Sequence, residues 1–98
     1  MKREVRARLK WRVPIPPRSE SPRGARFVVP ARFEQQGDDW IRNAWSLVVE
    51  TMSPPDPSGT QAVQIRFLME DAPIEWLAPG GKFSLFEGTL WLADGVVE

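Results

Sequence analysis

The sequence predicts an all-β fold in which six short strands, each with one apolar face, form an antiparallel barrel or sandwich. Apolar and polar residues alternate strictly in several segments, Pro- and Gly-rich turns separate these segments, and no helical period is sustained anywhere. A single sheet layer would leave the apolar faces in water, so the sheet must close on itself or fold over. With 98 residues the chain can bury one core, and we expect one domain, 1–98.

The first two strands are predicted at residues 4–13 and 26–33. Residues 4–13 alternate between charged and apolar side chains without a break, which indicates a half-buried strand with one face in solvent. In the second strand Pro30 removes one ladder hydrogen bond, which is typical of an edge or a bulge.

Residues 40–52 fit two structures. Asp38 or Asp39 could cap a helix there, but the content of Val, Thr and Trp favours a strand. Residues 61–69 alternate again, with Met69 on the apolar face. The residues predicted to point inward are Val5, Leu9, Trp11, Leu47, Val49, Val63, Ile65, Phe67, Phe83, Leu85 and Leu92.

The chain ends in a predicted hairpin, with strands at 82–87 and 89–97 joined around Gly88, which supplies a positive φ. Strict alternation places Leu90 and Leu92 on the inner face, and Phe86 and Trp91 on the outer face. An outward indole loses the stabilisation that burial gives a large side chain, about 2–3 kcal/mol. We therefore expect a loop of the same chain, a second copy or a partner to cover it.

From residue 63 to 97 the sequence resembles the end of the third domain of bacterial elongation factor Tu. The matching features are an alternating strand followed by Pro73-Ile74, Lys82-Phe83, Glu87-Gly88 and Gly95-Val96-Val97. Upstream, the likeness lies in strand order and spacing. The resemblance implies a closed, six-stranded, Greek-key antiparallel barrel that acts as a non-catalytic binding module.

In that family the barrel contacts tRNA, the GTPase domain and the exchange factor. This chain departs from the family at the hairpin tip, where Phe86 and the run 88–91 replace the usual arginines. Guanidinium groups grip phosphate, whereas Phe and Leu do not. We therefore predict that a protein partner, or a second copy, docks on the outer wall through Phe86, Leu90 and Trp91.

Charge is divided between the two parts of the chain. Residues 1–26 hold nine Lys and Arg against two Glu, a net charge of +7, and residues 27–98 hold −7. RNA binding through Arg6, Arg8, Lys10 and Arg12 is the alternative function, because these cations share one strand face at nearly the spacing of phosphates. The competing interpretation is that basic and acidic strands lie side by side and pair.

The composition disfavours catalysis, metal binding and a nucleotide site. The chain has no His and no Cys, and its serines therefore lack the usual base. The carboxylate pairs Asp38-Asp39 and Glu70-Asp71 fall in predicted turns, and no P-loop motif occurs. We expect no enzyme activity, no cofactor and no metal. No apolar run suits a membrane span or a secretion signal, so a cytoplasmic location is the expectation.

Overall fold

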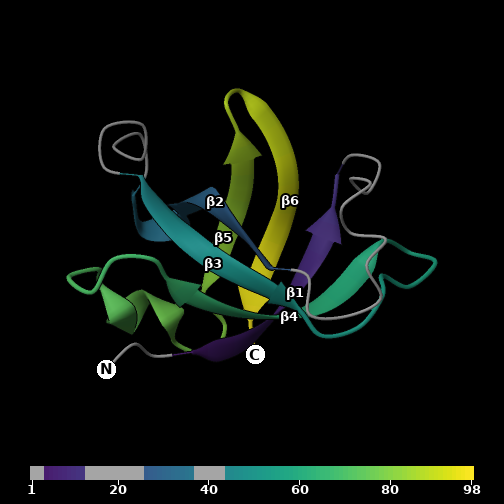
Figure 1. Cartoon of the computed structure of the whole chain (residues 1–98), viewed down its shortest axis with the longest axis horizontal. Coiled ribbons are helices and arrows are strands. Elements are labelled where there is room, and N and C mark those ends of the chain that lie inside the picture. Colours follow the sequence, from purple (N-terminus) through teal and green to yellow (C-terminus); the bar gives the residue numbers. More distant parts are fainter. Residues whose placement is uncertain (1–3, 13–25, 37–43) are drawn as a thin grey trace.

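In a computed structural model that describes residues 4–12, 26–36 and 44–98, six β-strands form a closed antiparallel barrel (Figure 1). The predicted all-β barrel is thereby confirmed. Going round the barrel, the order is β1-β4-β3-β2-β5-β6, and β6 pairs with β1 to close it. The strands are β1 (Val5–Trp11), β2 (Arg26–Phe33), β3 (Trp45–Thr51), β4 (Thr60–Phe67), β5 (Lys82–Glu87) and β6 (Leu90–Val97).

The topology contains a Greek key. β2, β3 and β4 are consecutive antiparallel neighbours, and β1 lies beside β4 on the far side of this set. β1 is therefore the closing strand, with β4 on one edge and β6 on the other. The predicted strand at 40–52 is confirmed as β3 from Trp45 onward, whereas Asp38, Asp39 and residues 40–43 lie outside the described residues.

The inward faces of the strands form one apolar core. Every predicted inward residue is buried except Val5, which is half-buried and packs against the core. Alternation within each strand is what separates the faces, as the pattern buried–exposed–buried in β1 shows. The structure adds Ala31 and Phe33 of β2 to the core, both with no exposed surface.

One end of the barrel is filled by aromatic rings around Phe33. Its ring centroid lies 5.3 Å from Phe67, 5.4 Å from Trp76 and 5.7 Å from Phe83. Trp76 belongs to a short 3₁₀ helix, η3 (Ile74–Leu77), which the sequence did not predict. The inward placement of Met69 was wrong: β4 ends at Phe67, and the Met69 side chain is 54% exposed.

Pro30 marks the point at which β2 loses its second neighbour. The ladder between β2 and β5 runs from Ala31 to Phe33, whereas the ladder between β2 and β3 continues back to Arg26. Proline has no N–H to donate, so the β5 side of β2 is an edge before residue 31. The local edge that Pro30 predicted is therefore present within a closed barrel.

A buried amide connects two strands at the opposite end. The Trp11 indole Nε1 donates to Gln61 Oε1 at 3.0 Å, and Gln61 Nε2 donates to the Ser53 carbonyl at 2.9 Å. Gln61 is only 2% exposed, so its buried amide satisfies the buried Trp11 N–H and the carbonyl of half-buried Ser53.

Gly95 makes room for an aromatic ring. It lies directly opposite Phe83, and a methyl group built on Gly95 would overlap the Phe83 ring. The ring covers the backbone of the glycine, which is a known way of stabilising glycine within a strand.

Over the described ranges, no helix is long and apolar enough to span a membrane.

We expect Gly95→Ala to destabilise the fold by about 1–3 kcal/mol, because the added methyl overpacks a filled core. Phe83→Leu in the same chain should recover part of that loss, so the two changes should be non-additive in a double-mutant cycle measured by urea denaturation. Additive losses would contradict the contact between Phe83 and Gly95.

We expect Gln61→Leu to cost about 1–3 kcal/mol, because it leaves the buried Trp11 N–H and the Ser53 carbonyl without partners. Gln64→Leu is the matched control, since Gln64 lies on the same strand but is only half-buried. Thermal denaturation of the two variants should place Gln61→Leu clearly below Gln64→Leu, and equal midpoints would contradict the buried amide's role.

Candidate binding surface on the outer wall

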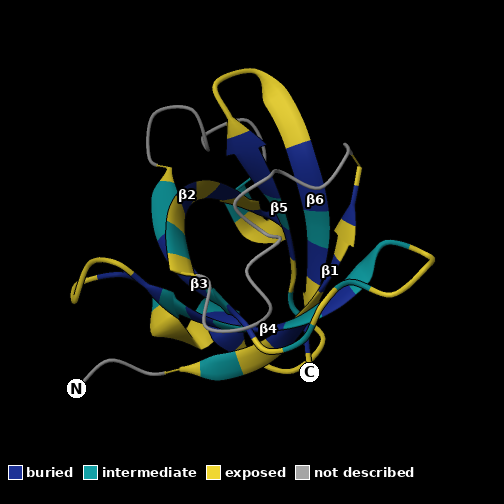
Figure 2. Ribbon diagram, turned by 45° about the vertical axis from the view of Figure 1, so that its right-hand side comes forward, coloured by how far each residue is buried: buried dark blue, intermediate teal, exposed yellow. Residues whose placement is uncertain are grey.

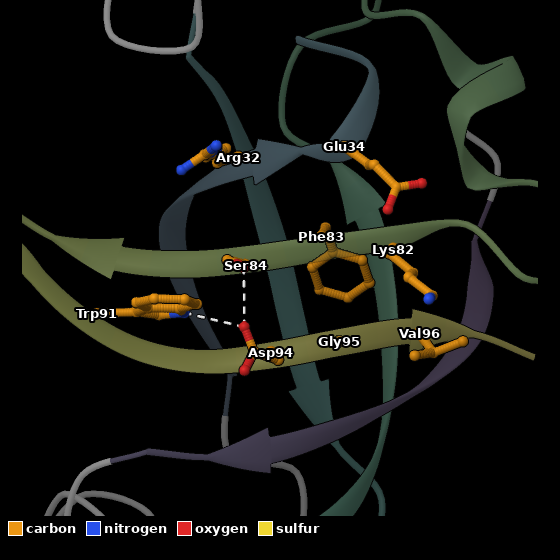
Figure 3. A pocket seen from close by; sticks show the side chains of 9 residues that line it. All are labelled: Arg32, Glu34, Lys82, Phe83, Ser84, Trp91, Asp94, Gly95 and Val96. Carbon is orange, nitrogen blue, oxygen red and sulfur yellow. Dashed lines mark hydrogen bonds between the residues drawn. The ribbon is translucent and has the colours of Figure 1, made fainter. Parts of the chain in front are cut away.

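A β-bulge in β6 determines which of its side chains face outward. Leu85 of β5 pairs with Ala93, but the next residue, Phe86, pairs with Trp91, so Leu92 is the extra residue. Leu92 and Ala93 are both buried in the core. Strict alternation would place Trp91 and Asp94 on opposite faces, and the bulge brings both to the outer wall (Figure 3).

Trp91 is held on the outer wall by groups from both neighbouring strands. Its ring stacks on Phe86 of β5, with centroids 5.8 Å apart and planes at 21°. The Arg12 guanidinium, just after β1, lies 3.7 Å from the Trp91 ring centroid. The indole Nε1 donates to Asp94 Oδ1 at 2.9 Å. The same chain therefore supplies part of the expected cover, and 41% of Trp91 stays exposed.

Asp94 connects this group of side chains. Its Oδ1 also accepts a hydrogen bond from Ser84 Oγ at 2.9 Å, and its Oδ2 lies 3.2 Å from Arg12 Nη1. The Asp94 carboxylate thus receives Trp91 of β6, Ser84 of β5 and Arg12, which follows β1. Asp94 is not recognisable as a site residue from the sequence, because its role depends on the bulge, which unbroken alternation does not indicate.

The other two predicted docking residues differ from Trp91. Phe86 is only 9% exposed and lies outside the core cluster, so its ring chiefly supports Trp91. The expected inward placement of Leu90 was wrong: it is 50% exposed. Figure 2 shows why, since the tip of the β5–β6 hairpin projects beyond the barrel wall and is exposed.

Beside Trp91 the outer wall is hollowed. The hollow has a volume of about 330 Å³ and extends along β5 and β6 from Trp91 to Val96, with Ser84, Asp94 and Gly95 between them (Figure 3). Arg32, Glu34 and Lys82 lie at its rim, and Phe83 also contributes to the lining. These rim residues were not candidates in the sequence, because β2 and β5 become neighbours only in the folded barrel.

The basic strand pairs with acidic side chains on its β6 side, as the competing interpretation of the charge division predicted, whereas β4 on its other side contains no Asp or Glu. Arg8 Nε lies 2.9 Å from Glu98 Oε2, Arg12 pairs with Asp94, and Lys10 Nζ donates to the Ser58 carbonyl at 2.7 Å. Across the described ranges, Arg6 forms no side-chain ion pair. The stripe Arg6, Arg8, Lys10 and Arg12 is exposed but largely engaged.

In the described part of the chain, no group of acidic side chains is arranged to hold a metal ion. The pair Glu70-Asp71 is exposed after the end of β4. Asp56 has its pKa lowered, chiefly by the hydrogen bond from the Ser58 hydroxyl and then by the backbone N–H of Thr60. These bonds close a turn, which is a structural role.

Comparisons with known proteins give no relative. No protein family matches the chain, no curated protein is similar to it, and no solved structure matches it. The geometry of the outer wall is therefore the basis for assigning a function.

We expect Trp91→Ala to lower stability by about 1–3 kcal/mol, because it removes the stacking on Phe86, the contact with Arg12 and one hydrogen bond to Asp94. Leu90→Ala is the control, since Leu90 is more exposed and should change stability by less than about 0.5–1 kcal/mol. Denaturation midpoints compare the two, and an unperturbed Trp91→Ala would contradict the side-chain arrangement around Asp94.

Proposed function

We propose that this chain is a non-catalytic binding module that docks a protein partner on the outer wall of β5 and β6. The observation that carries the proposal is the exposed indole of Trp91. Phe86, Arg12 and Asp94 all contact this indole, and it lies beside a hollow in the outer wall. Tryptophan and arginine are enriched among the residues that dominate binding energy at protein interfaces.

Preorganisation is the physical reason that such a residue suits docking. A side chain that must be ordered on binding costs about 0.5–1.5 kcal/mol of entropy. The three contacts already order the Trp91 indole in the unbound barrel, so less side-chain entropy is lost when a partner binds to it. The resemblance to the elongation factor Tu barrel supports the same class of function, a β-barrel that binds partners through its outer surface.

RNA binding through the basic strand is the less favoured function. Single-stranded RNA is bound by stacking bases on open aromatic faces along a basic track. Here the Trp91 ring is in contact with Phe86 and Arg12, and Arg8, Lys10 and Arg12 contact groups of the chain itself. These contacts would have to be broken before the cations met phosphate.

The test is affinity capture from native cell extract by the immobilised chain, with and without ribonuclease. We expect Trp91→Ala to weaken capture of the partner at least about tenfold, which corresponds to about 1.4 kcal/mol. The control is Ile74→Ala, which removes another exposed apolar side chain. Ile74 lies in η3, is 42% exposed and does not line the hollow, so its loss should leave capture unchanged.

Two results would count against protein docking at this wall. Capture that is lost on ribonuclease treatment, falls steeply with salt and is weakened by the double change Arg8→Ala and Lys10→Ala would favour the RNA alternative. Equal capture by the native chain and Trp91→Ala, at a temperature where both are folded, would show that Trp91 is not part of the interface. Sedimentation of the purified chain shows whether the bound partner is a second copy.

A further inference from the structure

We propose that the docked segment is an acidic stretch of a partner protein that places one apolar side chain in the hollow between Trp91 and Val96. This inference rests on the proposed function and specifies the chemistry of the partner. It is carried by the charges around the hollow, by its size and by the exposed apolar groups at its two ends.

The charges come from two rows of side chains that cross the strands. One row runs from Arg32 through Ser84 and Asp94 to Lys10. The next runs from Lys82 through Val96 to Arg8, with Glu34 at the rim beside it. With Glu34, and with the ion-pair partners Glu98 of Arg8 and Arg12 of Asp94, this surface holds five cations and three carboxylates, an excess of two positive charges.

The excess at the hollow itself lies on Arg32 and Lys82. Within the described residues neither side chain forms an ion pair, whereas Asp94 is already paired with Arg12 and accepts two further hydrogen bonds. The carboxylate on the floor is thus compensated by its own neighbours, whereas the rim carries two cations, Arg32 and Lys82, against the one carboxylate of Glu34, a net charge of +1. An acidic segment complements this distribution and a basic one is repelled.

The size and lining of the hollow specify the anchor. About 330 Å³ is at the small end of ligand pockets, so the hollow suits one inserted side chain and not a large organic ligand. Trp91, 41% exposed, forms one end and Val96, 44% exposed, forms the other. Gly95 lies between them, and the Phe83 ring occupies the space that a side chain on Gly95 would take. An aliphatic side chain of the size of leucine would fit in the space between these two ends.

The probe is a capped heptapeptide in which a central leucine is flanked by acidic residues, titrated into the ¹⁵N-labelled full chain at low salt. We expect chemical-shift changes at the backbone amides of Lys82, Ser84 and Val96 and at the Trp91 indole N–H. Replacing the central leucine by alanine should weaken binding about fivefold or more, because apolar surface no longer fills the hollow.

Charge reversal gives the sharper test. The double variant Arg32→Glu and Lys82→Glu should bind the acidic peptide at least about tenfold more weakly and gain binding to the matching lysine-flanked peptide. Both residues are exposed, so the change should leave the fold intact. The control Arg6→Glu reverses an exposed cation that forms no ion pair within the described residues and does not line the hollow, and it should retain binding. Glu34→Gln should strengthen binding about two- to threefold, since it removes a repelling carboxylate at the rim.

Several results would overturn the inference. They are the absence of shifts at millimolar acidic peptide, equal binding by the charge-reversed variant, and tighter binding of a ten-residue oligouridylate at the same resonances. Failure here is distinguishable from failure of the proposed function. If Trp91→Ala weakens capture of the cellular partner but Arg32→Glu and Lys82→Glu does not, protein docking stands and the acidic segment is wrong.

Discussion

Closure of the sheet by β1 is the constraint on which the rest of the structure depends. β1 pairs with β4 on one edge and with β6 on the other, so its apolar side chains complete the core and no open edge remains between first and last strands. Without this strand the inward faces of its two neighbours would meet water. The core then has a defined inside, and the outer wall becomes a continuous surface on which side chains from distant segments meet.

Closure also explains the charge division. The ion pairs Arg8–Glu98, Arg12–Asp94 and Arg26–Glu50 each join the basic first part of the chain to the acidic remainder. These pairs are exposed, and exposed ion pairs typically contribute only about 0–1 kcal/mol. Their effect is therefore on specificity more than on stability. The first two favour the pairing of β1 with β6 and engage basic side chains that nucleic acid could otherwise contact, and Arg26–Glu50 favours the pairing of β2 with β3.

The bulge in β6 makes the candidate surface. It moves Asp94 to the same face as Trp91, so that one carboxylate receives the indole N–H, the Ser84 hydroxyl and the Arg12 guanidinium. Two adjacent residues, Leu92 and Ala93, remain in the core in compensation. Bulges often redirect side chains in this way next to binding sites. The indole is consequently both exposed and ordered, which is the combination that the proposed docking function uses.

The sequence by itself determined the six strands, most of their inward faces and the opposed charges, because alternation and turn residues act between neighbouring positions; it failed for Met69 and Leu90, which lie beyond or at the end of a strand. It also indicated that Trp91 faces outward. Only the tertiary structure decided that Phe86 supports the indole, that Asp94 joins it, and that Arg32 and Lys82 border a hollow beside it. The physical reason is that these contacts depend on which strands become neighbours and on a one-residue shift in register. A period of two along one strand records neither.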